Sequence, residues 1–211
     1  MTHRRAVALM VLVTLLWSVA GVVTRHLEAA RSFEVTFWRS AFNALGLIAV
    51  LGWMRGTALF SGLLRAPRFV WLSGLCWAVM YTAFMLAITL TTVANVLVMM
   101  AIGPMVTALL ARFLLGHRLP TRTWMAIAAA GAGIAWMFGG QAGEGLSLSG
   151  SLVAAAVPLA AAVNWNILQK TGNAGADGAD MLPAVLIGAV LSALVTLPVA
   201  WPMQASPHDL G

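Results

Sequence analysis

Charged residues are scarce in this chain. Asp, Glu, Lys and Arg together make up 9% of its 211 residues, whereas a soluble domain carries about 25%. Hydrophobic residues make up 61%, which is more apolar surface than a soluble fold of this length could bury. A lipid bilayer removes this problem because it is itself an apolar solvent. The composition therefore excludes an ordinary soluble domain and predicts a membrane protein.

The residue types that build most metal sites and catalytic sites are also few. The single cysteine, Cys76, lies in an apolar run, which excludes a disulfide framework and a metal-thiolate site. We interpret it as a small core residue. The four histidines lie at chain ends or in loops and show no metal-ligand spacing; they are His3, His26, His117 and His208. We therefore expect neither an enzyme nor a cofactor or metal.

Carboxylates are missing from the apolar runs. Every acidic residue is expected in a loop or at a helix edge; these are Glu28, Glu34, Glu144, Asp177, Asp180 and Asp209. Carriers that are driven by protons often use a carboxylate within the membrane. We expect no such relay here.

The apolar runs are long enough for helices that cross a bilayer, which takes about 20 residues. About seven segments qualify, and short alternating strands of a membrane barrel are not seen. They lie near residues 6–23, 35–54, 69–88, 93–115, 123–138, 152–168 and 181–202. The first is too long for a signal peptide and lacks a clear cleavage pattern. The sequence predicts an all-α membrane protein.

Basic residues outnumber acidic ones, which gives a net charge of +6, and most of them lie in the breaks between these segments. This placement favours membrane topology over nucleic-acid binding. Alternate loops hold most of them: Arg4, Arg5, Arg55, Arg65, Arg68, Arg118, Arg122 and Lys170. The positive-inside rule then puts the N-terminus in the cytoplasm and, after seven crossings, the C-terminus outside. We expect a multi-pass protein of the cell (inner) membrane.

Arg39 is the most informative charge, because it lies about one turn inside the second segment with Asn43 on the same helix face. One interpretation is that its side chain extends to the membrane interface. The other is that it lines a substrate vestibule that faces outside, or pairs with Glu34. In the third segment, Trp77 and Tyr81 begin an apolar stripe that continues through Phe84 and Ile88. Such a stripe is either helix packing or a binding wall.

Other polar residues interrupt apolar helices. Trp17 and Ser18 do so in the first segment, and Asn164, Trp165 and Asn166 do so in the sixth. Asparagines at membrane depth are costly unless they bond across helices or face water, and both interpretations stay open.

A proline and a stretch of small residues are expected to affect the shape and packing of two segments. Pro104 lies inside the fourth segment, where it frees a carbonyl group and is expected to bend the helix. The small residues of 128–133 in the fifth segment are expected to let helices approach closely.

Four stretches together resemble the drug/metabolite transporter superfamily, specifically its EamA-type permeases. They are LLWSVAGVVTRHL in the first segment, FWRSAFNALGL in the second, ANVLVMMAIGPMVTALLARFLLGHRLP in the fourth and WMAIAAAGAGIAWMF in the fifth. The resemblance covers about residues 15–138. His117 departs from it, since the family has Glu there in a Gly-Glu-Arg pattern.

The resemblance implies a ten-helix fold of two inverted five-helix repeats with the site between them. On that basis residues 1–141 would form the first repeat, and 142–211 would supply two helices of the second. We accordingly expect a chain that resembles the first seven helices and lacks the last three. A second copy, a separate polypeptide or a longer reading frame would then complete the carrier.

The resemblance also implies a permease that moves small organic metabolites or drugs outward by alternating access. Its cavity would be lined by Trp17, Arg39, Asn43, Tyr81 and Asn95, faced by Asn164 and Trp165, with Pro104 as the bend. A retinal protein is excluded because a Schiff-base lysine is missing from 181–201. A non-transporting membrane scaffold or an inactive fragment of a longer permease stays open as the alternative.

Overall fold

The computed structural model describes residues 7–8, 10–12, 15, 32–56, 58–116, 120–142, 147–173 and 181–202. These residues form helices and connecting turns, and none of them is in a strand. The helices are α2 (Ser32–Arg55), α3 (Ala58–Leu64), α4 (Arg68–Leu90), α5 (Val93–Met100), α6 (Gly103–Leu115), α7 (Thr121–Ala142), α8 (Leu148–Asn173) and α9 (Leu182–Ala200).

Within this described part, five helical segments are long and apolar enough to cross a membrane. They are Phe33–Arg55, Arg68–Leu90, Val93–Leu114, Leu148–Thr171 and Leu182–Ala200, the second, third, fourth, sixth and seventh segments expected from the sequence. The fifth expected segment forms α7, which has 22 residues and is about 33 Å long at the rise of an α-helix. The first, at 6–23, lies mostly outside the described residues. The prediction of an all-α, multi-pass membrane protein is confirmed.

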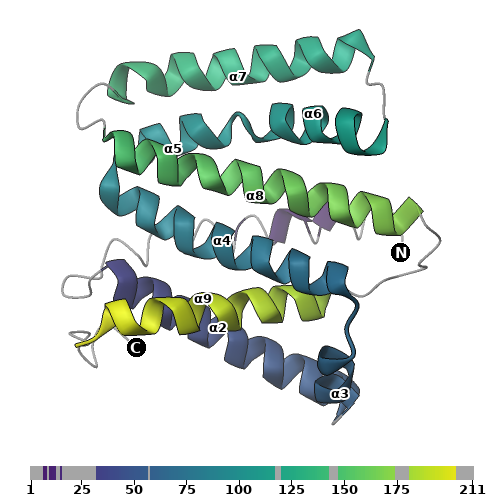
Figure 1. The fold of residues 1–211 in the computed structure, drawn as a ribbon. Helices are drawn as coiled ribbons and strands as arrows, with labels where there is room; N and C mark the ends of the chain where they lie inside the picture. Colours follow the sequence, from purple (N-terminus) through teal and green to yellow (C-terminus); the bar gives the residue numbers. More distant parts are fainter. Residues whose placement is uncertain are drawn as a thin grey trace.

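The long helices lie side by side, and their order in space is not their order in the chain (Figure 1). α4 packs between α8 and α9, α2 packs on α9, and α8 also contacts α5 and α6. α7 packs on α5 at the outer edge. The division into 1–141 and 142–211 stays a prediction; in space, α8 and α9 pack among the helices of the first part.

The backbones of α4 and α9 approach closely where glycines meet. A Cβ atom added to Gly74 would lie 2.6 Å from Cγ2 of Ile187, and one added to Gly188 would overlap Cβ of Trp77 and lie 2.9 Å from the Gly74 carbonyl oxygen. Small residues at such contacts increase van der Waals packing, which drives helix association in lipid. α4 and α9 therefore form the tight centre of the bundle.

The fourth expected segment is divided into two helices by a turn at Ala101–Ile102. Pro104 lies at the start of α6, where its missing N–H costs no helical hydrogen bond. A Cβ on Gly103 would lie 3.6 Å from Cβ of Pro158, so α8 passes directly beside the break. α8 itself stays helical through Pro158.

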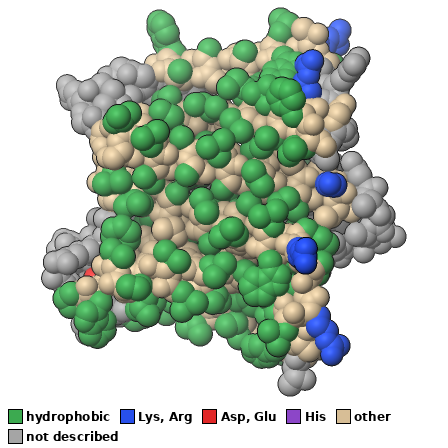
Figure 2. Space-filling model, viewed as in Figure 1, with side chains coloured by type: hydrophobic (Ala, Val, Ile, Leu, Met, Phe, Trp, Pro, Cys, Tyr) green, Lys and Arg blue, Asp and Glu red, His purple; other side chains and the backbone are tan. Residues whose placement is uncertain are grey.

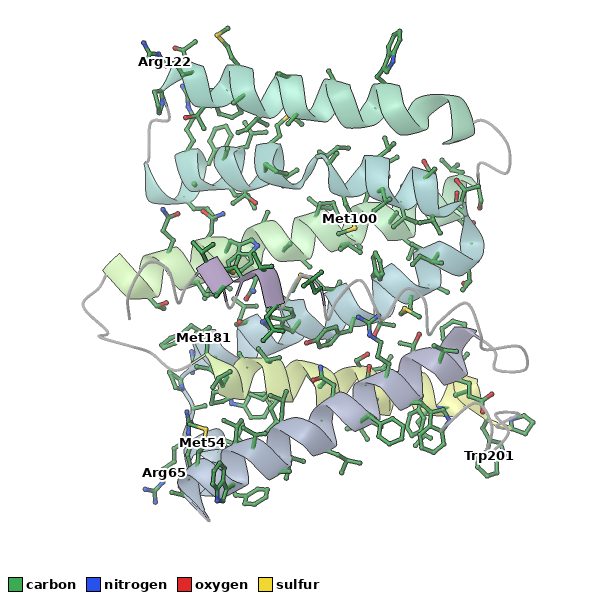
Figure 3. The ribbon with its side chains drawn as sticks, turned by 180° about the vertical axis from the view of Figure 1, so that it is seen from behind. Met54, Arg65, Met100, Arg122, Met181 and Trp201 are labelled. Carbon is green, nitrogen blue, oxygen red and sulfur yellow. The ribbon has the colours of Figure 1, made fainter. Side chains whose placement is uncertain are left out.

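Basic side chains gather along one edge of the molecule (Figure 2). Arg65 and Arg122 lie at this edge although they belong to opposite ends of the helical layer (Figure 3). The other described basic residues of this edge are at helix ends that lie on the same side of the molecule (Figure 1): Arg55, Arg68, Arg112 and Lys170. We call this the basic edge. Among the described Lys and Arg residues, Arg39 alone lies well inside a helix.

We predict that the basic edge faces the cytoplasm, as the positive-inside rule requires. Reporter fusions after Arg65, Arg122 and Lys170 should give a cytoplasmic signal, and a fusion after Gly145 should give an external one. A cytoplasmic signal from Gly145 would overturn this orientation.

Candidate functional site

Two residues of α2 meet two residues of α4 in a polar cluster. Arg39 donates a hydrogen bond from Nη1 to Sδ of Met85 at 3.4 Å. Asn43 donates from Nδ2 to the hydroxyl of Tyr81 at 3.3 Å. Arg39 and Asn43 are four residues apart in α2, and Tyr81 and Met85 are four residues apart in α4, so the two residues of each helix lie on one face. We call these four residues the Arg39 cluster.

The Arg39 cluster has capacity to bind an anion. A thioether is a weak acceptor, whereas a guanidinium group carries five donors that match a carboxylate in pairs. The Tyr81 hydroxyl accepts from Asn43, so its own proton can be donated to another acceptor. Arg39 and Asn43 are both exposed in the described structure. Arg39 lies about 10 Å along α2 from its start, where a carboxylate would neutralise a charge that is costly in a membrane.

An aromatic surface adjoins the Arg39 cluster. The rings of Trp77 and Tyr81 have centroids 5.6 Å apart and are tilted by 36°, and both side chains are half-buried. Phe84 and Ile88 pack against the core cluster of Ala87, Val96 and Ala154, and Tyr81 and Trp77 also pack against core clusters. The stripe therefore serves helix packing along its length, and its Trp77–Tyr81 half also adjoins the Arg39 cluster.

A largely buried network of hydroxyl groups lies next to the Arg39 cluster. Ser40 donates to the Ser192 hydroxyl at 3.0 Å, and the hydroxyls of Thr82 and Ser192 are also 3.0 Å apart. Ser40 follows Arg39 and Thr82 follows Tyr81, so the network joins α2, α4 and α9 at the level of the cluster. Sequence reasoning missed it. The available signal was Ser192, which with Thr196 is one of two hydroxyl residues in an apolar helix, but nothing in the sequence indicated its partners.

Asn164 and Asn95 lie at a different interface. Asn164 is buried and accepts a hydrogen bond from the Ser73 hydroxyl of α4 at 2.5 Å. Asn95 is buried and donates to the Ser151 hydroxyl of α8 at 2.8 Å. Both amides thus join α8 to its neighbours, and the structure does not bring them to the Arg39 cluster. Of the two interpretations, this arrangement favours bonding across helices over a polar cavity.

Asn166 also joins two helices. Its amide nitrogen donates to the carbonyl oxygens of Thr107 in α6 and of Ala162 in α8, at 3.3 and 2.8 Å. Its Oδ1 atom is buried without a hydrogen-bond partner. The side chain therefore uses its donors to hold α6 against α8.

The remaining expected lining residues fall outside this site. Trp165 is 53% exposed on the surface of α8, unlike its buried neighbour Asn164. Trp17 lies outside the described residues. Pro104, which was expected as the bend and not as a lining residue, lies in the first turn of α6. Of the expected lining residues, the structure thus brings together Arg39, Asn43 and Tyr81. No group of three or more His, Cys, Asp or Glu side chains that could hold a metal ion occurs among the described residues.

We predict that the Ser73–Asn164 bond contributes about 0.6 kcal/mol, and at most about 1.7 kcal/mol, the range found for hydrogen bonds between membrane helices. The test is a double-mutant cycle with Ser73→Ala and Asn164→Ala, read by unfolding of the purified chain in mixed micelles. Strict additivity of the two changes would show that the bond does not couple α4 to α8.

Comparison with known proteins adds two findings. The sequence pattern of the EamA-like transporter family matches residues 4–139. A solved structure, described only as the crystal structure of a protein, aligns with a TM-score of 0.59 and 23% identity over 91% of this chain. This likeness shows a shared fold, and the chain spans 65% of the length of that structure. A comparison with curated proteins gave no match.

Proposed function

The chain belongs to the EamA-like transporter family, and on that premise we propose that it carries small organic metabolites or drugs outward across the cell membrane. Membership in this family and the multi-pass helical structure support a permease. Lining residues that touch the solute and a backbone able to bend are the parts that such a carrier needs.

The observation that carries the proposal is the Arg39 cluster. We propose that its solute is anionic or zwitterionic and bears a carboxylate. Arg39 would bind the two carboxylate oxygens, and Tyr81 would donate its hydroxyl proton to one of them. The rings of Trp77 and Tyr81 would contact the apolar part of the solute. Binding would exchange the weak contact with Met85 for a charge-assisted pair.

Alternating access requires helices that change their relative positions. We propose that the turn at Ala101–Ile102 is the bending point, because the chain there already departs from a continuous helix. The hydroxyl network at Ser192 would hold α2 and α4 together as they move, so that the Arg39 cluster stays assembled.

The test is transport by the purified chain in lipid vesicles. Uptake and efflux are measured for a panel of amino acids and other carboxylates, each paired with its uncharged amide. We expect saturable flux of at least one carboxylate and little flux of its amide. The size of the reconstituted species is measured in parallel, since the ten-helix arrangement would require a second copy or further helices. Absence of saturable flux for every solute from a reconstituted species of two or more copies would favour a membrane scaffold.

A further inference from the structure

A cavity lies between α7 and the break that separates α5 from α6. Its volume is about 380 Å³. One wall is the turn at Ala101–Ile102 with its flanking apolar side chains, including Val98 and Met105. The other wall is α7. In Figure 3 the label Met100 marks the end of α5, beside the break, and the label Arg122 marks the start of α7.

The α7 wall consists of small residues, which the sequence suggested would pack tightly. They are Ala128, Gly131, Ala132 and Ala135, spaced so that they share one helix face. A Cβ atom on Gly131 would meet nothing within 4 Å. The expectation of close approach is therefore wrong for this face, because the opposite wall lies beyond the reach of an added methyl group. The small residues leave a hollow.

The lining determines what can fill that hollow. Its side chains are apolar, and the indole N–H of Trp124 is the one side-chain donor among them. Water gains too few hydrogen bonds in such a space to be held there. In a membrane, the abundant apolar group that can enter is a lipid acyl chain.

The length of the cavity and the positive charge at one of its ends indicate which kind of lipid would bind. From Trp124 to Ala135 the cavity runs about 16 Å along α7, close to the thickness of one leaflet, about 15 Å. Its Trp124 end adjoins the basic edge, since Arg122 is in the first turn of α7 and Arg112 is in the last turn of α6. Both arginines are exposed. Basic sites between membrane helices are suited to anionic headgroups.

We propose that an anionic phospholipid binds here, with one acyl chain in the cavity and its phosphate at Arg112 and Arg122. The bound chain fills the space beside the break at Ala101–Ile102. This site is separate from the Arg39 cluster and does not depend on the proposed transport function.

The test measures lipid retained by the purified chain. Protein is exchanged into vesicles with equal amounts of phosphatidylglycerol and phosphatidylethanolamine, extracted in mild detergent and examined by native mass spectrometry. We expect phosphatidylglycerol to be retained preferentially. Gly131→Leu should lower retention about tenfold, the effect of losing the burial of about two methylene groups. Arg112→Gln and Arg122→Gln should each lower it about fivefold.

Matched variants provide the controls. Gly133→Leu makes the same change on α7 at a glycine that has open space around it and does not line the cavity. Arg65→Gln removes a basic side chain elsewhere on the basic edge. Both should retain lipid like the parent. Equal retention by Gly131→Leu and Gly133→Leu, or equal binding of the two lipids, would overturn the proposal.

A second measurement on the parent chain needs no variant. Phosphatidylglycerol with a diazirine in its acyl chain is photolysed in the vesicles, and the adducts are mapped by peptide mass spectrometry. Adducts concentrated on residues 98–105 and 124–135 would support the site. Adducts distributed over all lipid-facing helices would overturn it, as would a dimer that excludes lipid and that Gly131→Leu converts to monomer.

Discussion

Replacing Arg39 by alanine is expected to weaken carboxylate transport strongly while leaving the helical fold intact. A hydrogen bond to a charged group contributes about 1.5–3 kcal/mol, so the affinity for the solute should fall by a factor of about 10 to 200. In the folded chain the guanidinium of Arg39 donates a hydrogen bond to the thioether of Met85, a weak acceptor, and its side chain is exposed. Removing the Arg39 side chain should therefore change the stability of the fold only slightly. The measurement is saturable flux in vesicles.

Arg39→Lys separates charge from geometry. It keeps the positive charge but loses the planar pair of donors, so we expect an affinity between those of the parent and Arg39→Ala. The amide analogue of the solute should lose its disadvantage in Arg39→Ala, because no charge remains to distinguish it. Arg65→Ala, at the basic edge, serves as the control and should transport like the parent. If Arg39→Ala transports as well as the parent, Arg39 is only an interface anchor.

The largest effect on stability is expected from Gly188→Ala. The added Cβ would overlap that of Trp77 and lie 2.9 Å from the Gly74 carbonyl oxygen and 3.1 Å from the Ala78 nitrogen. Two of these three atoms belong to the backbone of α4, so relief requires the two helices to separate. Such overpacking costs about 1–3 kcal/mol and occasionally more. The separation would also pull Ser192 away from Ser40 and Thr82.

The matched control is Gly46→Ala in α2, where an added Cβ meets nothing within 4 Å. Alanine is the better helix former by about 0.8–1.0 kcal/mol, so this variant should be as stable as the parent or more stable. Thermal unfolding and the monodisperse fraction in detergent measure both variants. The two substitutions should shift the melting temperature in opposite directions. Equal shifts would show that α4 and α9 are not in close contact at Gly188.

Local spacing predicted part of the candidate site. The i, i+4 spacing of Arg39 and Asn43 placed them on one helix face. Tyr81 carries a further signal, because a hydroxyl group in lipid needs a hydrogen-bond partner. The structure identifies Asn43 as that partner. Asn95 and Asn164 are also polar side chains in apolar runs, yet their amides form hydrogen bonds between helices and do not line the site. A polar side chain in an apolar run shows that a partner is needed, and it does not show which helix supplies it.

The sequence by itself determined the helices and their place in a membrane. Backbone groups in lipid must be paired within the segment, so apolar runs of this length become helices whatever surrounds them. Only the tertiary structure decided which helices are neighbours. Ser40 and Ser192 are 152 residues apart, and Ile187 packs directly on Gly74 because glycine has no side chain to keep it away. Such contacts depend on shapes that are brought together across the bundle, and no local period in the chain records them.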